Sequence, residues 1–166
     1  MKTLKTLLFF SALAAACVPA GVGITDRAQI TEAVAGRFNL WSRAGTNRSL
    51  DTLSALYQHT RDVVVMWTDG TWSRGWSEIS PRLERRNADL TSLNFVVNNS
   101  AIDVLDRDVV LVTFRTTIDA VIRGERSRHA GRGTQVWQLD PADGRWKIRA
   151  EHQSFVPENL IPVPSP

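Results

Sequence analysis

The hydrophobic periodicity of the sequence changes once, near Ser92, and this change limits the folds that the chain can adopt. Before Ser92, apolar residues recur at spacings of three and four, which is the pattern of a helix that buries one face. One such stripe consists of Ile30, Val34, Phe38 and Trp41. After Ser92, long apolar and β-branched runs alternate with turn sequences, which indicates extended strands. Helices followed by consecutive strands predict an α+β fold, with helices packed on a mainly antiparallel sheet.

The same patterns give the extents of the individual elements. The predicted helices cover residues 27–44, about 49–58 and a stretch from 77; the predicted strands cover residues 63–67, 72–74, 93–104, 108–121, 128–139 and a stretch from 145. The two short strands should form a hairpin around Asp69 and Gly70, a favoured turn sequence. We expect the long strands to curve strongly around a helix and to form a cone with one open mouth. Ligand pockets commonly form in the mouths of such barrels.

The last predicted strand alternates between apolar and polar residues. One set is Trp146, Ile148, Ala150, His152 and Ser154, and the other is Arg145, Lys147, Arg149, Glu151 and Gln153. Because successive side chains of a strand point to opposite faces, we expect the first set in the core and the second in solvent. This alternation places His152 on the apolar face, near the mouth of the cone.

Length and charge exclude several classes of protein. The 166 residues include 43% hydrophobic and 22% charged residues, which fits one globular domain and no disordered or multi-pass membrane chain. Lys2 and Lys5 supply two of the 20 basic residues, against 17 acidic ones, so the rest of the chain is nearly neutral. A nucleic-acid-binding domain should carry a basic stripe. We therefore expect no nucleic-acid partner.

The N-terminus has the pattern of a secretory signal peptide over residues 1–20. Lys2 and Lys5 precede an apolar block at residues 7–16, and small residues follow. Cleavage after Ala20 would release an exported, periplasmic or secreted protein. Alternatively, residues 13–17 resemble a bacterial lipobox, and a lipid on Cys17 would then tether the protein to a membrane. Cys17 is the only cysteine, so no intrachain disulfide can form. Four prolines mark residues 157–166 as a tail.

Several stretches resemble the nuclear transport factor 2-like (NTF2-like) superfamily. They are residues 66–71 (Met-Trp-Thr-Asp-Gly-Thr) with Gly75, 106–115 (Asp-Arg-Asp-Val-Val-Leu-Val-Thr-Phe-Arg), 131–137 (Gly-Arg-Gly-Thr-Gln-Val-Trp), 144–148 (Gly-Arg-Trp-Lys-Ile) and 151–154 (Glu-His-Gln-Ser). The last three resemble the SnoaL-like, DUF4440-type branch, which is similar to the association domain of calcium/calmodulin-dependent kinase II. The resemblance covers about residues 24–156. It implies a cone of three N-terminal helices on a strongly curved sheet, a pocket, and usually a homodimer formed through the sheet.

This superfamily includes ketosteroid isomerases, dehydratases, binding proteins and assembly domains, so the fold alone does not give a function. Two departures from its patterns bear on catalysis. Branch members often carry another histidine two residues before the last one, where this chain has Ala150. Ketosteroid isomerases use a tyrosine on the first helix, whereas the only tyrosine here is Tyr57, in the second predicted helix. Ketosteroid isomerase chemistry is therefore not expected.

Candidate catalytic residues are His152 and Asp119. A neutral imidazole at the mouth could exchange a proton near neutral pH, although a structural histidine bonded to a backbone carbonyl fits the same pattern. Arg115 and Asp119 lie four residues apart on one strand, about 13 Å, so both could reach one cavity or both could face solvent. Predicted ligand-binding residues are Trp67, Trp137, Arg115 and Thr113. No residue spacing indicates a metal or cofactor site.

Three functions remain open from the sequence. The first is an exported domain that binds a small apolar or amphipathic molecule in its pocket. The second is a cofactor-independent isomerase or dehydratase in which His152 and a carboxylate move a proton. The third is a dimeric assembly module whose cone is filled by Trp and Phe side chains.

Overall fold

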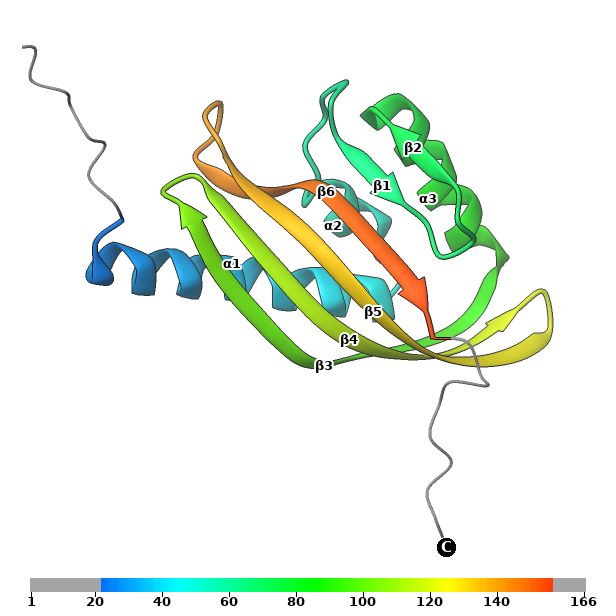
Figure 1. Ribbon diagram of the computed structural model, residues 1–166. Coiled ribbons are helices and arrows are strands. Elements are labelled where there is room, and N and C mark those ends of the chain that lie inside the picture. Colours follow the sequence, from blue (N-terminus) through cyan, green and yellow to red (C-terminus); the bar gives the residue numbers. More distant parts are fainter. Residues whose placement is uncertain (1–21, 157–166) are drawn as a thin grey trace, which may run out of the picture.

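The computed structural model describes residues 22–156 (Figure 1). The predicted signal peptide, Cys17 and the proline-rich tail lie outside the described residues. The elements are, in order, α1 (Ile24–Thr46), α2 (Leu50–Ser54), β1 (Val64–Met66), β2 (Trp72–Arg74), α3 (Trp76–Asp89), β3 (Leu90–Asp106), β4 (Val109–Ile122), β5 (Glu125–Asp140) and β6 (Arg145–Phe155). The predicted α+β class and the predicted order of helices and strands are confirmed. The second helix is shorter than predicted, since it ends at Ser54.

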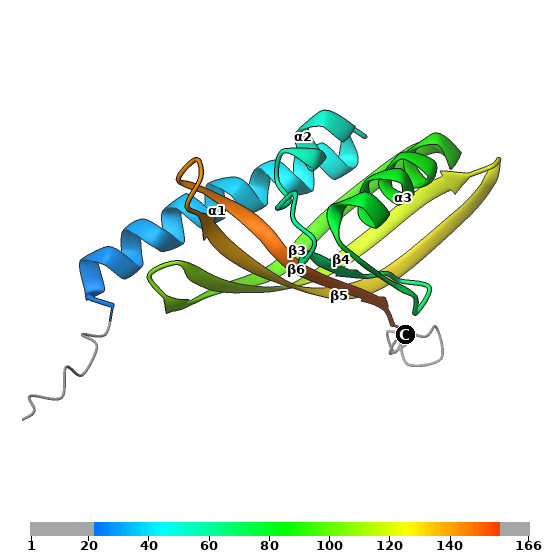
Figure 2. The same ribbon diagram turned by 90° about the horizontal axis from the view of Figure 1, so that it is seen from above.

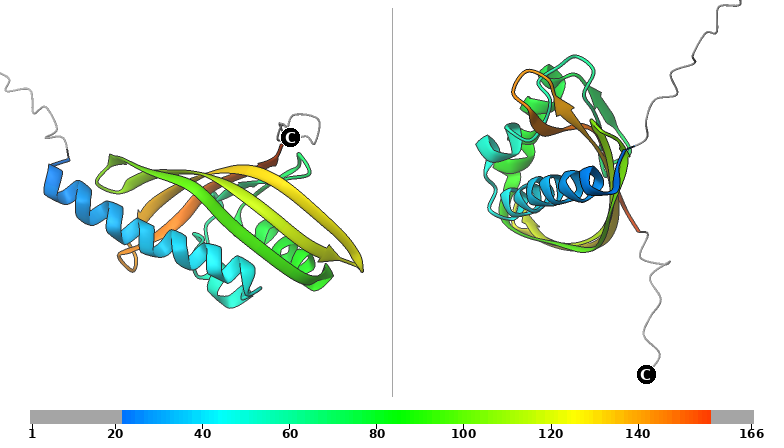
Figure 3. Two further views of the ribbon diagram at one scale, coloured as in Figure 1. Left: turned by 90° about the horizontal axis from the view of Figure 1, so that it is seen from below. Right: turned by 90° about the vertical axis from the view of Figure 1, so that its left-hand side faces the viewer.

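The six strands form one sheet in the order β2-β1-β6-β5-β4-β3. All neighbours are antiparallel except β1 and β6, which run parallel. The helices lie on one side of the sheet (Figure 2), and the long strands curl around α1 (Figure 3). We call the sheet face toward α1 the inner face and the opposite face the outer face. This arrangement is the strongly curved cone that the family resemblance implied.

The apolar stripe of α1 anchors the inner face. Val34, Phe38 and Trp41 are buried, as the helical spacing predicted. Phe114 of β4 lies against both aromatic rings, with centroid distances of 5.1 Å to Phe38 and 5.3 Å to Trp41. Aromatic pairs at such distances add to the stabilisation that burial of their surface provides. This aromatic cluster fills the space between the middle of α1 and β4, within a core to which α2, α3 and strands on both sides also contribute.

Glycines on β5 allow this aromatic layer to approach the sheet. A Cβ atom placed on Gly133 would lie 2.3 Å from Cζ of Phe114, which is far inside contact distance. Gly131 is similarly crowded, by Oγ1 of Thr116 at 2.7 Å. The Gly-Arg-Gly motif that carried part of the family resemblance thus has a packing role, because only glycine fits under these side chains.

A β-bulge in β6 changes which of its side chains face inward. Trp137 of β5 pairs with Ile148, but its neighbour Val136 pairs with Ala150, so Arg149 is an extra residue in β6. Such an insertion reverses the inward and outward positions beyond it. The predicted uninterrupted alternation is therefore correct for Trp146 and Ile148 and wrong from Ala150 onward.

No helix within residues 22–156 is long and apolar enough to cross a membrane.

Candidate functional site

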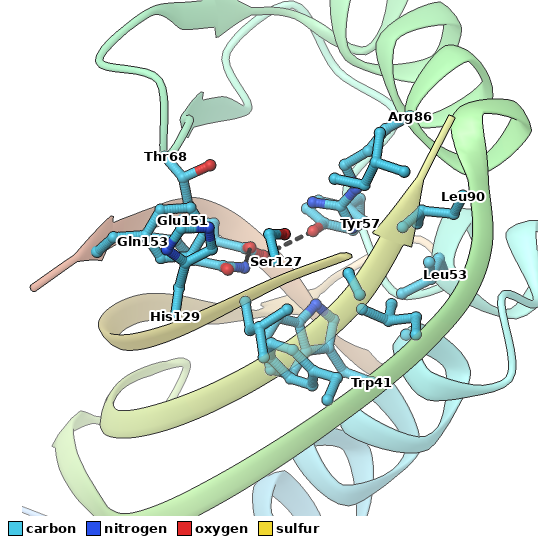
Figure 4. A pocket seen from close by; sticks show the side chains of 17 residues that line it. Trp41, Leu53, Tyr57, Thr68, Arg86, Leu90, Ser127, His129, Glu151 and Gln153 are labelled. Atoms are coloured by element: carbon cyan, nitrogen blue, oxygen red, sulfur yellow. Dashed lines mark hydrogen bonds between the residues drawn. The ribbon is translucent and has the colours of Figure 1, made fainter. Parts of the chain in front are cut away.

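A cavity of about 260 Å³ lies between the inner face of the sheet and the helices α1 and α3 (Figure 4). Most of its wall is apolar and comes from both the helices and the sheet. These apolar side chains include Trp41, Leu53, Leu90, Phe95, Ile118 and Ile122. The periodicity of β4 explains the sheet contribution, since Ile118, Ala120 and Ile122 alternate with outward-facing residues. The arrangement suits a ligand whose body is apolar.

The polar end of the cavity is built around the carboxyl group of Glu151. Tyr57 Oη donates a hydrogen bond to Glu151 Oε2 at 2.6 Å, and Gln135 Nε2 donates to the same oxygen at 3.0 Å. Gln153 Nε2 donates to the other oxygen, Oε1. Behind Gln135, Trp137 Nε1 donates to Gln135 Oε1 at 3.0 Å, which fixes the direction of the Gln135 amide. Donors from β5, from β6 and from the segment after α2 thus hold one buried carboxylate at the cavity wall.

Burial raises the pKa of both Glu151 and Tyr57. Desolvation raises the pKa of Glu151 above its ordinary value, although the hydrogen bonds from Tyr57 and Gln153 act in the opposite direction. Burial also raises the pKa of the Tyr57 hydroxyl, and the nearby charge of Glu151 raises it further. Tyr57 therefore stays protonated as a donor, while Glu151 is a more basic carboxylate than an exposed one.

Other polar groups surround the opening near Glu151. His129, on β5, lines the cavity and stacks on the ring of Phe155 with a centroid distance of 4.4 Å. Arg86 of α3 approaches from the opposite wall, beside Tyr57 (Figure 4). Its positive charge lowers the pKa of both Tyr57 and Glu151, but less than burial raises each of them. An imidazole, a guanidinium and a buried carboxylate therefore meet at one end of an apolar cavity.

His152, Arg115 and Thr113 do not lie in this cavity. His152 pairs with Thr134, which pairs with Thr113, and all three line a hollow on the outer face. The prediction that His152 shares the apolar face was wrong, because the bulge at Arg149 turns it outward. Arg115 lies on the same outer hollow, which is the exposed alternative that the sequence left open.

Asp119 also faces outward, between the inward-facing Ile118 and Ala120. Its carboxylate accepts two hydrogen bonds from Arg126, at 2.8 and 3.1 Å, and this pairing lowers its pKa. Asp119 lines neither the cavity at Glu151 nor the outer hollow that His152 lines. The predicted acid–base pair is therefore not assembled in this structure.

The two predicted tryptophans are buried but serve the core. Trp137 is fully buried and holds Gln135, so it supports the Glu151 site from behind. Trp67 donates to Ser73 Oγ at 3.0 Å, and the guanidinium of Arg82 lies 4.6 Å from its ring centroid. Neither lines the cavity, where Trp41 is the tryptophan present.

The polar end of the cavity consists of residues that the sequence did not single out as site residues. They are Glu151, Gln153, Tyr57 and His129. The alternation of β6 assigned Glu151 and Gln153 to solvent because it assumed no bulge. The spacing placed Tyr57 on the apolar side of the second predicted helix, whereas it reaches Glu151 from the segment after α2. An alternation that changes by one position after Ile148 assigns Glu151 to the inner face, as the register with β5 requires.

Among residues 22–156, no group of three or more His, Cys, Asp or Glu side chains could hold a metal ion.

Comparison with known proteins identifies relatives of this fold. A family model for the SnoaL-like domain matches residues 34–158. A candidate dehydratase of the NTF2-like family from Streptomyces avermitilis has a TM-score of 0.71 at 20% identity, with 79% of this chain and 99% of that chain covered. An NTF2-like superfamily protein from Salmonella enterica serovar Typhimurium has a TM-score of 0.68 at 21% identity, with 82% and 95% covered.

A candidate calcium/calmodulin-dependent protein kinase II association domain from Xanthomonas campestris has a TM-score of 0.63 at 24% identity, with 75% of this chain and 86% of that chain covered. At these identities the similar structures show a common fold, and the narrower DUF4440-type assignment stays a prediction. No curated protein matches the sequence. These structures share the NTF2-like cone with this chain. Because the family model spans most of the chain, the protein belongs to the SnoaL-like domain family.

Proposed function

We propose that the protein binds a small amphipathic organic molecule in the cavity, with the polar end of the molecule at Glu151. The observation that carries this proposal is a buried carboxylate at the polar end of a mostly apolar cavity. A carboxylate offers about four acceptor positions, and three are used by Tyr57, Gln135 and Gln153. The free position on Oε1 favours a ligand that donates a hydrogen bond, such as a hydroxyl, an enol or an amine.

The cavity also argues against a purely structural role. A cone that served only assembly would be filled by Trp and Phe side chains, whereas this one leaves about 260 Å³ free. That space holds a molecule of modest size and makes the binding function the better supported of the two.

Binding can be tested with two variants of β4. Ala120 lines the cavity, while its neighbour Val121 does not. Ala120→Leu should fill part of the cavity and weaken ligand binding at least tenfold, and Val121→Leu should leave it unchanged. A panel of hydroxylated and non-hydroxylated apolar compounds can be screened by thermal unfolding, because a ligand at 100 times its Kd stabilises by about 2.7 kcal/mol. Equal binding by both variants would show that the ligand sits elsewhere.

A second candidate function is proton transfer, as in an isomerase or a dehydratase. It is supported by the raised pKa of Glu151 and by the presence of His129 in the same cavity. In such a reaction Glu151 would take a proton from carbon, and His129 would polarise the neighbouring oxygen, since the Tyr57 hydroxyl already donates to Glu151. The candidate dehydratase from Streptomyces avermitilis is consistent with this chemistry.

If the protein catalyses proton transfer, substitutions of His129 in the cavity and of His152 on the outer face should have different effects. Once a ligand is known, exchange of its acidic C–H for deuterium can be followed by NMR. Glu151→Gln should slow the exchange at least a hundredfold while binding persists, and His129→Ala should slow it less. His152→Ala serves as the control on the outer face, so a loss of exchange in that variant alone would contradict this assignment.

We also propose that the protein is exported and forms a homodimer. The sequence of residues 1–20 supports export, and the family resemblance supports the homodimer. Native mass spectrometry of protein purified gently from its producing cells would report the oligomer and any retained ligand together.

A further inference from the structure

One position of the apolar stripe of α3 is occupied by an arginine. Ile79 and Leu83 are buried on this stripe, and so is Leu90, directly after the last residue of the helix. Arg86 follows Leu83 by three residues and precedes Leu90 by four, so it lies on the same face of the helix. Arg86 and Leu90 both line the cavity. Because Arg86 is exposed to solvent, its charge stands at the rim of the cavity and not in the core.

The guanidinium of Arg86 has no acidic partner in the protein. Among residues 22–156, Arg86 forms no salt bridge. Asp89, one turn further along α3, is bound to Arg123 at 2.8 Å. The charge of Arg86 lowers the pKa of Glu151 across the cavity, but the two groups are not in direct contact. Its donors are therefore available to a ligand.

The end of α3 that carries Arg86 is held in place by another arginine. Arg48 Nη2 donates to the carbonyl oxygen of Asn87 at 3.2 Å, and Nη1 donates to that of Thr91 at 3.1 Å. These bonds tie the last turn of α3 and the start of β3 to the segment between α1 and α2. Arg86 thus extends from a fixed backbone toward Tyr57 (Figure 4). A site that is already ordered loses less conformational freedom when a ligand binds.

We propose that the ligand of the cavity carries a carboxylate that pairs with Arg86, together with a hydroxyl or amine that donates to Glu151. The proposal rests on the binding function proposed above and names the class of ligand, a small carboxylic acid with an apolar body. A single guanidinium matches a carboxylate both in charge and in the spacing of the two oxygens. Tyr57 contacts Glu151 and lies beside Arg86, so the two polar groups belong to the same end of the ligand.

A hydroxy acid or an amino acid with an apolar side chain has this arrangement. The site is also compatible with a dimer formed through the sheet, because α3 lies on the side away from the outer face (Figure 2).

Pairs of an acid and its amide test the role of Arg86. Phenyllactate and phenylalanine carry the carboxylate, whereas their amides keep the ring and the hydroxyl or amine but lack the negative charge. Hydrogen bonds between ionised groups are about twice as strong as neutral ones. We therefore expect wild-type protein to bind the acids about tenfold more tightly than the amides, as measured by titration calorimetry at neutral pH and constant ionic strength.

Two variants of α3 complete the experiment. Arg86→Gln should abolish the preference for the acids and bind the amides as the wild type does. Arg85→Gln removes a neighbouring charge that does not line the cavity, so it should keep the preference. If Arg86→Gln weakens acids and amides equally, Arg86 acts only through Glu151 or through the fold, and the proposal is wrong.

Other outcomes separate this proposal from the binding function on which it rests. If the amides bind the wild type as tightly as the acids, or if Arg85→Gln loses the preference as fully as Arg86→Gln, the pairing with Arg86 is wrong and the binding function stands. The same holds if only neutral compounds of the earlier panel bind. If neither that panel nor the acids and amides bind the wild type, the binding function is itself wrong.

Discussion

At the scale of single residues, the Tyr57–Glu151 hydrogen bond links the core to the cavity. Its donor and acceptor lie 2.6 Å apart and both side chains are buried. Tyr57→Phe removes the donor and leaves the carboxylate with two hydrogen bonds in a dry environment. Since hydrogen bonds to charged groups contribute about 1.5–3 kcal/mol, we expect the free energy of unfolding at pH 8 to fall by about that amount. Urea denaturation measures it, and an unchanged midpoint would show that the hydroxyl is not bonded.

The pH dependence of stability gives a second prediction at this scale. Burial raises the pKa of Glu151 in the folded protein above 4.5, its ordinary value. Between pH 4.5 and the folded-state pKa, the folded protein therefore holds more protons than the unfolded one, and its stability falls as pH rises. Each unit of that pKa difference corresponds to about 1.4 kcal/mol.

Glu151→Gln removes this dependence while keeping the shape of the side chain. We expect the variant to gain stability relative to the wild type as pH rises from 4.5, and the gain to level off above the folded-state pKa. Urea titrations at several pH values measure the difference between the two proteins. Aspartates with lowered pKa values, such as Asp119 and Asp140, are present in both the wild type and the variant. Their contributions to the pH dependence therefore cancel when the two proteins are compared. A constant difference across pH would contradict the raised pKa.

At the scale of elements, the sequence predicted the helices and strands well because each has a strong local period. The stripe at Val34, Phe38 and Trp41 is buried, and all six strands are present where apolar runs, alternation and turn sequences predicted them. The site was predicted poorly, because the bulge at Arg149 is set by pairing with β5 and leaves no mark on the alternation of β6. Because of this one extra residue, Glu151 faces the cavity and His152, the predicted catalytic residue, faces outward.

The glycine beneath Phe114 gives a prediction about a single strand. Gly133→Ala would place a methyl group 2.3 Å from a buried aromatic ring, and Phe114 has little room to move against Phe38 and Trp41. Overpacking of this kind costs about 1–3 kcal/mol, which should appear as a lower midpoint of thermal unfolding. Gly36→Ala is the matched control. A Cβ there meets nothing within 4 Å, and the same change within a helix should stabilise by about 0.5–1 kcal/mol.

At the scale of the whole molecule, the buried core described here needs no cysteine. The single cysteine of the chain, Cys17, precedes residues 22–156, so packing alone stabilises the domain. A chain that starts at Gly21 should therefore unfold in one transition, with the same midpoint in the presence and absence of reductant. A second unfolding transition would contradict this expectation. A chain without cysteine has no disulfide that reductant could break.

The position of the mature N-terminus decides in which compartment the domain works. Residues 1–20 have the charge and apolar pattern of an export signal, so intact-mass measurement on protein from its native cells should find a chain that begins at Gly21. A chain that begins at Cys17 with added lipid mass would place the domain at a membrane surface. An uncleaved chain that begins at Met1 in the soluble fraction of the cell would contradict export. The cavity would then meet cytoplasmic metabolites instead of compounds outside the cytoplasm, and the panel of ligands to screen would change accordingly.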